Sequence, residues 1–196
     1  MTDLNKLKQY IVQFHPISDD AYRMMSDCMQ YTELKKKEIL IKAGRIDSNF
    51  YIPFHGYFRA YHLDNTQNEI TVYFVTPGNP VASMASYFHS EPAKLQIEAI
   101  TDASVFIIPK DDMERLCSQS IEIANWFRMV CLDELYCLEH RCIVFGESEA
   151  GFRYKSMIKS RPEIMKHVPL KYIASYLGIT QQSLSRLRLQ LKNDSD

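Results

Sequence analysis

Apolar residues near the N-terminus recur at the three- and four-residue intervals of a helix, at Leu4, Leu7, Tyr10, Ile11 and Phe14. The run Ser18-Asp19-Asp20 is typical of a helix N-cap and predicts a second helix, which passes through Met24, Met25 and Cys28. The first forty residues are therefore expected to form short helices that pack against a domain.

The next seventy residues change to short β-rich runs. These runs cover residues 39–41, 50–54, 57–63, 70–75, 95–101 and 105–109. Turn-forming residues separate them, notably Gly44, Gly56, the polar cluster 64–68 and Pro77-Gly78-Asn79-Pro80. Many short strands without a helix between them predict an antiparallel barrel or sandwich.

Helical periodicity returns after residue 110. A short helical turn is expected over 113–117 and a long helix over 120–145, with one apolar stripe formed by Phe127, Cys131, Leu135, Leu138 and Cys142. A lone helix with one such stripe needs a partner, and a second copy of the chain would supply it. In the alternative interpretation the stripe packs on the barrel as ordinary core. Both interpretations can hold on different sides of one helix.

The most informative pattern lies at residues 170–189, which read as a complete helix-turn-helix. Ile173 and Leu177 give the first helix an apolar face, and Ala174 is small where a second helix must cross closely. Gly178 suits the positive φ of a tight turn, after which Ile179 fills the corner. Thr180 is a good N-cap for the second helix. The residues expected to face the core from that helix are Leu184, Leu187 and Leu191.

The outer side of that second helix carries hydrogen-bonding groups and no acid. Its residues are Gln182, Ser183, Ser185, Arg186 and Gln190. Gln and Arg have paired hydrogen-bonding atoms that suit adenine and guanine edges. The alternative is an ordinary helical hairpin with a solvated outer face, which the in-phase Gly, Thr and apolar positions disfavour.

Charge supports DNA binding when it is counted by segment. The chain of 196 residues carries a formal charge of −1. Residues 149–196 hold nine basic and four acidic residues, a net +5, which leaves −6 for the rest. A basic C-terminal quarter on an acidic body is typical of a protein that brings only one end to phosphates.

Composition indicates a two-domain cytoplasmic protein. Hydrophobic residues make up 46% of the chain, enough for one large core and a small satellite domain. We find no cleavable signal and no apolar run long enough to span a membrane, so no membrane partner is expected.

The order of β-roll, long helix and helix-turn-helix resembles the Crp/Fnr superfamily of bacterial transcription regulators. The resemblance covers nearly the whole chain and is most specific in residues 168–188, with further matching segments at 38–44, 56–61 and 74–79. The segment Phe152-Arg153-Tyr154, followed by Arg161-Pro162-Glu163-Ile164, is similar to the branch of the superfamily common in Bacteroidetes.

This resemblance implies an α+β fold in three parts. It implies an antiparallel β-roll sensor domain of the cyclic-nucleotide-binding type, a double-stranded β-helix with flanking helices, over residues 1–118. A long dimerisation helix would cover 119–147 and an all-α helix-turn-helix domain 148–196. No C-terminal wing is expected, because the sequence ends shortly after the second helix of the motif.

The resemblance also places Gln181, Gln182 and Arg186 at the base-reading positions. The residues expected at the DNA interface are Lys171, Thr180, Gln181, Gln182, Ser183, Ser185, Arg186 and Arg188. The implied partners are double-stranded DNA and a second copy of the chain, with RNA polymerase and an unidentified small-molecule effector as further candidates.

Cyclic AMP is not expected as a cofactor. Relatives that bind it carry a Gly-Glu pair for the ribose and an Arg-Ser or Arg-Thr pair for the phosphate, whereas Ala82-Ser83 and Pro92-Ala93 stand at these places here. Residues 80–93 contain no Arg or Lys to balance a buried phosphate. A pocket for another effector would be lined by Ala82, Ser83, Met84, Tyr87, Phe88 and Lys94. We favour the alternative in which Met84, Tyr87 and Phe88 fill the core.

The cysteines and histidines form no metal motif. No C-x-x-C occurs, and Cys131 and Cys137 lie about 120° apart around one helix, so these two and Cys142 cannot converge on a metal. Buried, reduced thiols are expected, with no catalytic residue and no enzyme activity. A ligand sensor that acts through protein contacts is the second hypothesis. A metal-dependent barrel enzyme is a weaker third, since it would need a histidine cluster.

Overall fold

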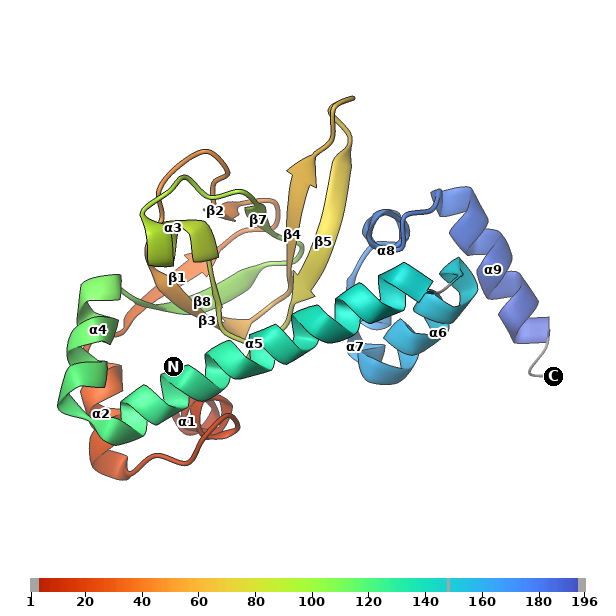
Figure 1. Ribbon diagram of the computed structural model, residues 1–196. Helices are drawn as coiled ribbons and strands as arrows, with labels where there is room; N and C mark the ends of the chain where they lie inside the picture. Colours follow the sequence, from red (N-terminus) through yellow and green to blue (C-terminus); the bar gives the residue numbers. More distant parts are fainter. Residues whose placement is uncertain (1–3, 148, 194–196) are drawn as a thin grey trace.

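The computed structural model describes residues 4–147 and 149–193, and its body is built from two antiparallel four-stranded sheets (Figure 1). The first sheet has the order β1 (Gln30–Leu34), β8 (Ala103–Ile108), β3 (Phe50–His55), β6 (Val81–Ala82). The second has the order β2 (Ile39–Ile41), β7 (Gln96–Ala99), β4 (Phe58–Leu63), β5 (Glu69–Val75). All the pairings are antiparallel, so the predicted β-roll is confirmed.

The polar cluster 64–68 forms the turn between β4 and β5, as predicted. The Asp64 carboxylate accepts backbone N–H groups of Thr66 at 2.8 Å and Asn68 at 2.9 Å. These hydrogen bonds, together with that from the Thr66 hydroxyl, lower the pKa of Asp64 to about 2. The turn is thus held by side-chain contacts with the backbone, as in an Asx-turn.

Two elements of the roll differ from the sequence prediction. Strand β1 begins at Gln30, inside the stretch expected to be helical, because it pairs along its whole length with β8. A short helix α3 (Met84–His89) lies between β6 and β7, where no helix was expected. The Ser83 side chain caps it by accepting the Ser86 N–H.

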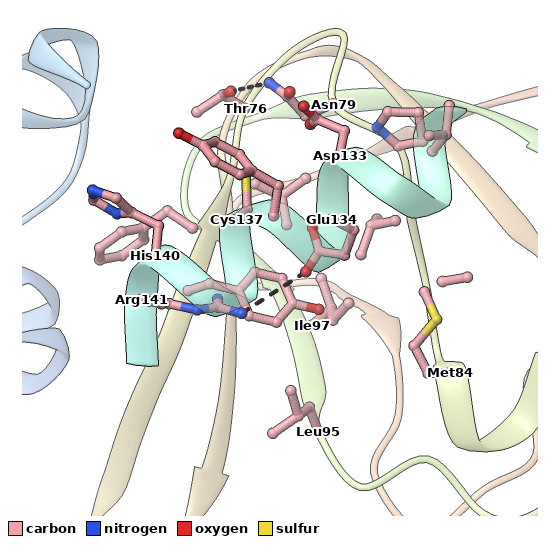
Figure 2. A pocket seen from close by; sticks show the side chains of 18 of the residues that line it. Thr76, Asn79, Met84, Leu95, Ile97, Asp133, Glu134, Cys137, His140 and Arg141 are labelled. Atoms are coloured by element: carbon pink, nitrogen blue, oxygen red, sulfur yellow. Dashed lines mark hydrogen bonds and ion pairs between the residues drawn. The ribbon is translucent and has the colours of Figure 1, made fainter. Parts of the chain in front are cut away.

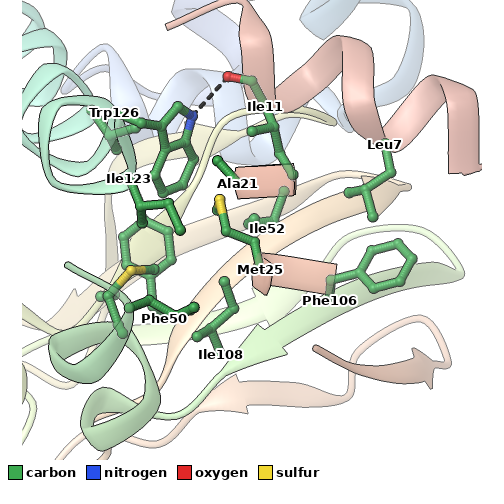
Figure 3. Packing of buried hydrophobic residues seen from close by; sticks show 14 of the residues in the cluster. Leu7, Ile11, Ala21, Met25, Phe50, Ile52, Phe106, Ile108, Ile123 and Trp126 are labelled. Carbon is green, nitrogen blue, oxygen red and sulfur yellow. Dashed lines mark hydrogen bonds between the residues drawn. The ribbon is translucent and has the colours of Figure 1, made fainter. Parts of the chain in front are cut away.

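The N-terminal helices α1 (Leu4–Val12) and α2 (Asp19–Asp27) pack against the first sheet, as predicted. The Ser18 side chain accepts the Ala21 N–H and so caps α2. Figure 3 shows Leu7, Ile11 and Met25 over this sheet, with Trp126 beside Ile11 and Leu7 on the side of Phe106. The wholly buried residues of the cluster include Ile11, Met25, Ile108, Met113, Leu116, Ile123 and Trp126.

Helix α4 (Lys110–Gln119) leads into the long helix α5 (Ile121–Glu147), which runs along the β-roll to the C-terminal helices (Figure 1). Helices α6 (Ala150–Ser160), α7 (Pro162–His167), α8 (Leu170–Tyr176) and α9 (Gln181–Asn193) follow. Residue 148, at the proposed boundary of the third domain, lies outside the described residues, and the division at 118 and 147 stays a prediction. Within the described ranges, no helix has the length and apolarity needed to cross a membrane.

The cysteines are free thiols, but their burial was overestimated. Cys28, Cys117, Cys131 and Cys137 are half-buried, and Cys142 is exposed. The prediction of a buried thiol is wrong for Cys142, which is exposed on α5. In the described part of the chain, no three His, Cys, Asp or Glu side chains gather as metal ligands would.

Candidate nucleic-acid interface and effector cavity

Helices α8 and α9 form the predicted helix-turn-helix. Gly178 has φ of +68°, and a Cβ there would meet no heavy atom within 4 Å, so the backbone conformation alone favours glycine. The Ile179 N–H donates to the Ala174 carbonyl at 3.1 Å and closes the turn. Thr180 Oγ1 accepts the Ser183 N–H at 3.1 Å, which confirms the predicted N-cap.

The apolar positions of the motif face its interior. The buried residues are Ile173, Ala174, Leu177 and Leu184, and Leu187 is half-buried beside them. The predicted core position Leu191 lies outside the residues whose side chains the structure describes. The inward face of α9 is thereby fixed, and its opposite face is turned to solvent.

The predicted DNA-contacting residues lie on the exposed side. All eight are exposed: Lys171, Thr180, Gln181, Gln182, Ser183, Ser185, Arg186 and Arg188. Gln182 and Arg186 are one helical turn apart, and within the described residues no ion pair or hydrogen bond holds either side chain. Arg188 lies about 200° around the helix from Arg186, on the other flank, where a phosphate contact is more reasonable than a base contact.

Sequence reasoning missed one residue of this face. Leu189 is 65% exposed and lies seven residues after Gln182, so it shares the Gln182 side of α9. The sequence prediction assigned Leu189 neither to the core-facing leucines Leu184, Leu187 and Leu191 nor to the outer face. An exposed apolar side chain here can contact a thymine methyl group or a protein.

Two of the basic residues counted toward DNA binding serve the fold. Arg153 Nη2 donates to the Leu177 carbonyl at 2.8 Å, and Arg161 Nη1 donates to the Phe74 carbonyl at 3.3 Å. The positive charge available to phosphates is therefore smaller than the segment count indicates.

The predicted stripe of α5 divides into two parts. Phe127 and Cys131 are half-buried, and Phe127 packs against the first core cluster. Leu135, at 60% exposure, and Leu138 are exposed together with Cys142. The exposed large apolar residues along this half of the helix are Leu132, Leu135, Tyr136, Leu138, Ile143 and Phe145. The core interpretation therefore fits the first half, and the second half is uncovered.

A cavity of about 530 Å³ lies between the roll and α5 and extends to α6 and α7. Figure 2 shows Met84, Leu95 and Ile97 on the roll side and Asp133, Glu134 and Arg141 on α5. All six predicted pocket residues line it: Ala82, Ser83, Met84, Tyr87, Phe88 and Lys94. Met84 is 48% and Phe88 52% exposed, so only Tyr87 is buried as core, and the favoured core-filling interpretation is wrong for the other two.

Three charged residues of the cavity, Asp133, Glu134 and Arg141, come from α5 and were not found from sequence. Glu134 Oε1 lies 3.8 Å from Arg141 Nη2, and the Arg141 guanidinium lies 5.1 Å from the centre of the Tyr73 ring. The Glu134 side chain is half exposed, and its partial desolvation raises its pKa, although Arg141 and Arg161 oppose the shift. The apolar positions of α5, on which its prediction rests, contain no signal for these side chains.

The α3 end of the cavity offers little to a cyclic phosphate. Lys94 is largely exposed and lies 3.4 Å from the Glu91 carboxylate. The Ser83 hydroxyl accepts the Ser86 N–H, and the Ser86 hydroxyl donates to the Glu91 carbonyl at 2.8 Å. The nearest hydroxyls are thus already hydrogen-bonded and the nearest cation is paired, so the residues present do not fit a cyclic nucleotide phosphate.

Residues 31–120 match the family model of the cyclic nucleotide-binding domain. The chain carries a cyclic nucleotide-binding domain. No curated protein sequence matches the chain significantly.

Several solved structures are similar to this chain over more than residues 31–120. FixK2 from Bradyrhizobium japonicum has a TM-score of 0.71 at 20% identity, covering 85% of this chain and 86% of its own. The c-di-GMP responsive regulator CLP from Xanthomonas campestris has a TM-score of 0.71 at 13% identity, covering 91% and 93%. A protein assigned to the crp/fnr family from Eubacterium rectale has a TM-score of 0.70 at 19% identity, covering 95% and 88%.

At these identities the likeness establishes a shared fold. The fold implied by the Crp/Fnr resemblance is confirmed, from the cyclic nucleotide-binding domain through the long helix to the C-terminal helices. The assignment to the Bacteroidetes branch stays a prediction.

Proposed function

We propose that this chain is a sequence-specific, DNA-binding transcription regulator of the Crp/Fnr type. The observation that carries the proposal is the outer face of α9, where Gln182 and Arg186 are exposed one turn apart. Their paired hydrogen-bonding atoms suit adenine and guanine, and the first half of the second helix makes the base contacts in this motif. RNA polymerase is the further partner expected of such a regulator.

The regulator is proposed to act as a homodimer joined along α5. The uncovered residues Leu132, Leu135 and Ile143 form an apolar strip that a second copy would bury. A two-fold axis along this strip would present two copies of α9. In such dimers the recognition helices are about 34 Å apart, one turn of DNA.

Cyclic AMP is not proposed as the effector, since the α3 end of the cavity lacks a free cation for its phosphate. We expect isothermal titration with cyclic AMP at millimolar concentration to give no saturable heat. Saturable binding that is lost in Lys94→Ala would show that Lys94 leaves Glu91 to hold the phosphate, and this part of the proposal would then be wrong.

The function is tested by selecting fragments bound by the purified protein from genomic DNA. We expect an inverted repeat whose half-sites are one helical turn apart, with affinity that falls steeply as salt rises. Enrichment of no common sequence over random fragments would contradict the proposal.

One observation favours the second hypothesis, a sensor that acts through protein contacts. Leu189 exposes an apolar side chain on the face assigned to DNA. The substitution Leu189→Gln separates the two functions, because DNA binding tolerates a polar group there whereas an apolar protein interface does not. Selected DNA fragments bound equally by both forms would support the regulator.

A further inference from the structure

Helix α8 closes the open edge of the second sheet. Strand β5 is the last strand of that sheet, so its outer backbone groups have no neighbouring strand. The Ser175 hydroxyl accepts the Thr71 N–H at 2.9 Å and donates to the Glu69 carbonyl at 2.8 Å. One side chain of α8, the helix that lies beside β5 in Figure 1, thus satisfies two backbone groups of the second sheet.

Arg59 lies in β4, the strand next to β5, and contacts both the β-roll and the helix-turn-helix. Its side chain is only 2% exposed, and its guanidinium carbon lies 4.0 Å from the centre of the Tyr61 ring and 3.9 Å from that of Tyr172. Tyr61 belongs to the sheet, whereas Tyr172 belongs to α8. Arg59 Nη2 also lies 2.5 Å from the Glu69 carboxylate and 3.4 Å from that of Glu98. The two carboxylates balance the buried charge, and the planar guanidinium can stack on both rings.

Tyr172 belongs to an apolar cluster that joins the β-roll to the C-terminal helices. Phe74 and Ile100 of the sensor share a cluster with buried residues of the C-terminal unit, namely Tyr154, Met157, Ile164, Val168, Tyr172, Ile173, Ala174, Leu177 and Leu184. The His167 ring stacks on Tyr57 with centroids 4.5 Å apart. Burial by these residues keeps water from the guanidinium, which strengthens its attraction to the rings.

We infer that Arg59 is the positioning residue that holds the helix-turn-helix on the sensor sheet in its DNA-binding pose. The inference rests on the proposed function. In this pose α8 lies between β5 and α9, and the DNA-facing residues of α9 remain exposed (Figure 1). The contact with the sheet therefore fixes the orientation of the recognition helix without covering it.

A fixed pose matters because two recognition helices must meet two half-sites together. A helix-turn-helix that is already oriented loses less conformational freedom when DNA binds. Once the first half-site is bound, the second recognition helix is held close to the second half-site, which favours its binding. Arg59 should thus affect binding to paired half-sites at one spacing and leave the reading of a single half-site unchanged.

The test compares Arg59→Lys, Tyr172→Leu and the double variant in the full-length dimer. Lysine keeps the charge beside Glu69 and Glu98 but cannot stack as a plane, whereas leucine keeps apolar volume without a ring. Binding is measured on selected DNA with both half-sites, on the same DNA with the spacing changed by two base pairs, and on a single half-site.

We expect each single variant to bind the paired site about tenfold more weakly and the single half-site within about twofold of wild type, from the size of a desolvated cation–π contact. Preference for the original spacing should shrink, and the double variant should lose little more than either single variant. Unchanged binding to the paired site overturns the inference. Tighter binding also overturns it, since the docked pose would then be an inhibited one.

Amide hydrogen exchange tests the contact without DNA. Ser175→Ala, Arg59→Lys and Tyr172→Leu should each speed exchange at the Thr71 N–H by at least about tenfold. Ser160→Ala is the matched control, because the Ser160 hydroxyl bonds only to carbonyls of its own helix. Exchange that is unchanged in all three variants overturns the inference. A wild-type protein without any DNA preference instead overturns the proposed function, and the exchange data alone then decide whether Arg59 holds the two units together.

Discussion

The indole N–H of Trp126 donates a 2.7 Å hydrogen bond to the carbonyl oxygen of Ile11, which joins the long helix α5 to the N-terminal helix α1. Both residues are wholly buried. The bond satisfies a carbonyl close to the end of α1 that has no partner within its own helix. The long helix is thereby fixed at its first turns to the N-terminal helix α1.

Replacing Trp126 with Phe should lower the free energy of unfolding by about 2–4 kcal/mol, from the lost hydrogen bond and the cavity left by the smaller ring. Urea unfolding followed by circular dichroism measures it, because the chain has no other tryptophan. Ile121→Ala, an exposed position on the same helix, is the control and should change stability little. A loss below 1 kcal/mol would show that the hydrogen bond and its packing add little.

Arg186→Ala should reduce discrimination at one base pair of each half-site by about 1–3 kcal/mol, because a side chain with two aligned donors is removed from the recognition face. Competition binding with single-base variants of the selected DNA measures this. Arg188→Ala is matched in charge and lies on the other flank. It should weaken binding to all sequences alike. Identical base preferences in wild type and Arg186→Ala would remove Arg186 from the base-reading role.

Leu135→Asp should convert the dimer to monomer, since a carboxylate would be buried in the proposed interface without a counter-charge. The side chain is exposed in the single chain, so the monomer fold should persist. Leu138→Asp tests the neighbouring stripe position in the same way. Light scattering gives the molar mass, and Leu63→Asp, at an exposed leucine of β4, is the control. An unchanged mass in both α5 variants would exclude this half of α5 from the interface.

The raised pKa of Glu134 should make the stability of the fold depend on pH. Its pKa is raised in the folded state, so between the ordinary value of 4.5 and the raised one the folded chain holds a proton that the unfolded chain has lost. The contribution of Glu134 to stability is therefore largest below pH 4.5 and falls as pH rises through this window. Glu134→Gln removes the titration and should gain stability relative to wild type from pH 4 to pH 7, as measured by urea unfolding. A stability curve for Glu134→Gln that runs parallel to that of the wild type over this range would contradict the raised pKa.

The helix-turn-helix was predictable because its signals are local. A glycine at positive φ, a capping threonine and leucines spaced at three and four positions each constrain a few residues of backbone, and Gly178 and Thr180 play these roles in the fold. The strands between turn clusters were predictable for the same reason. The fold class followed from the order of such elements.

Elements stabilised by distant partners were not predictable. Strand β1 exposes its first four residues, so its sequence lacks the alternation of a half-buried strand, and only its pairing with β8 defines it. The buried Arg59 has no sequence signature, because its burial depends on Tyr172 more than one hundred residues away. Glu134 points into the cavity only because of the way in which α5 packs across the β-roll. Tertiary contacts decide each of these features.

The docking of α8 on β5 also has a consequence for solubility. Without the helix-turn-helix, the outer edge of β5 would be a bare strand with its Thr71 N–H and Glu69 carbonyl available to other molecules. Such edges recruit strands from neighbouring chains and lead to aggregation. The helix-turn-helix therefore also protects this sheet edge, and the β-roll produced alone would need a charged or proline substitution on β5 to stay monodisperse.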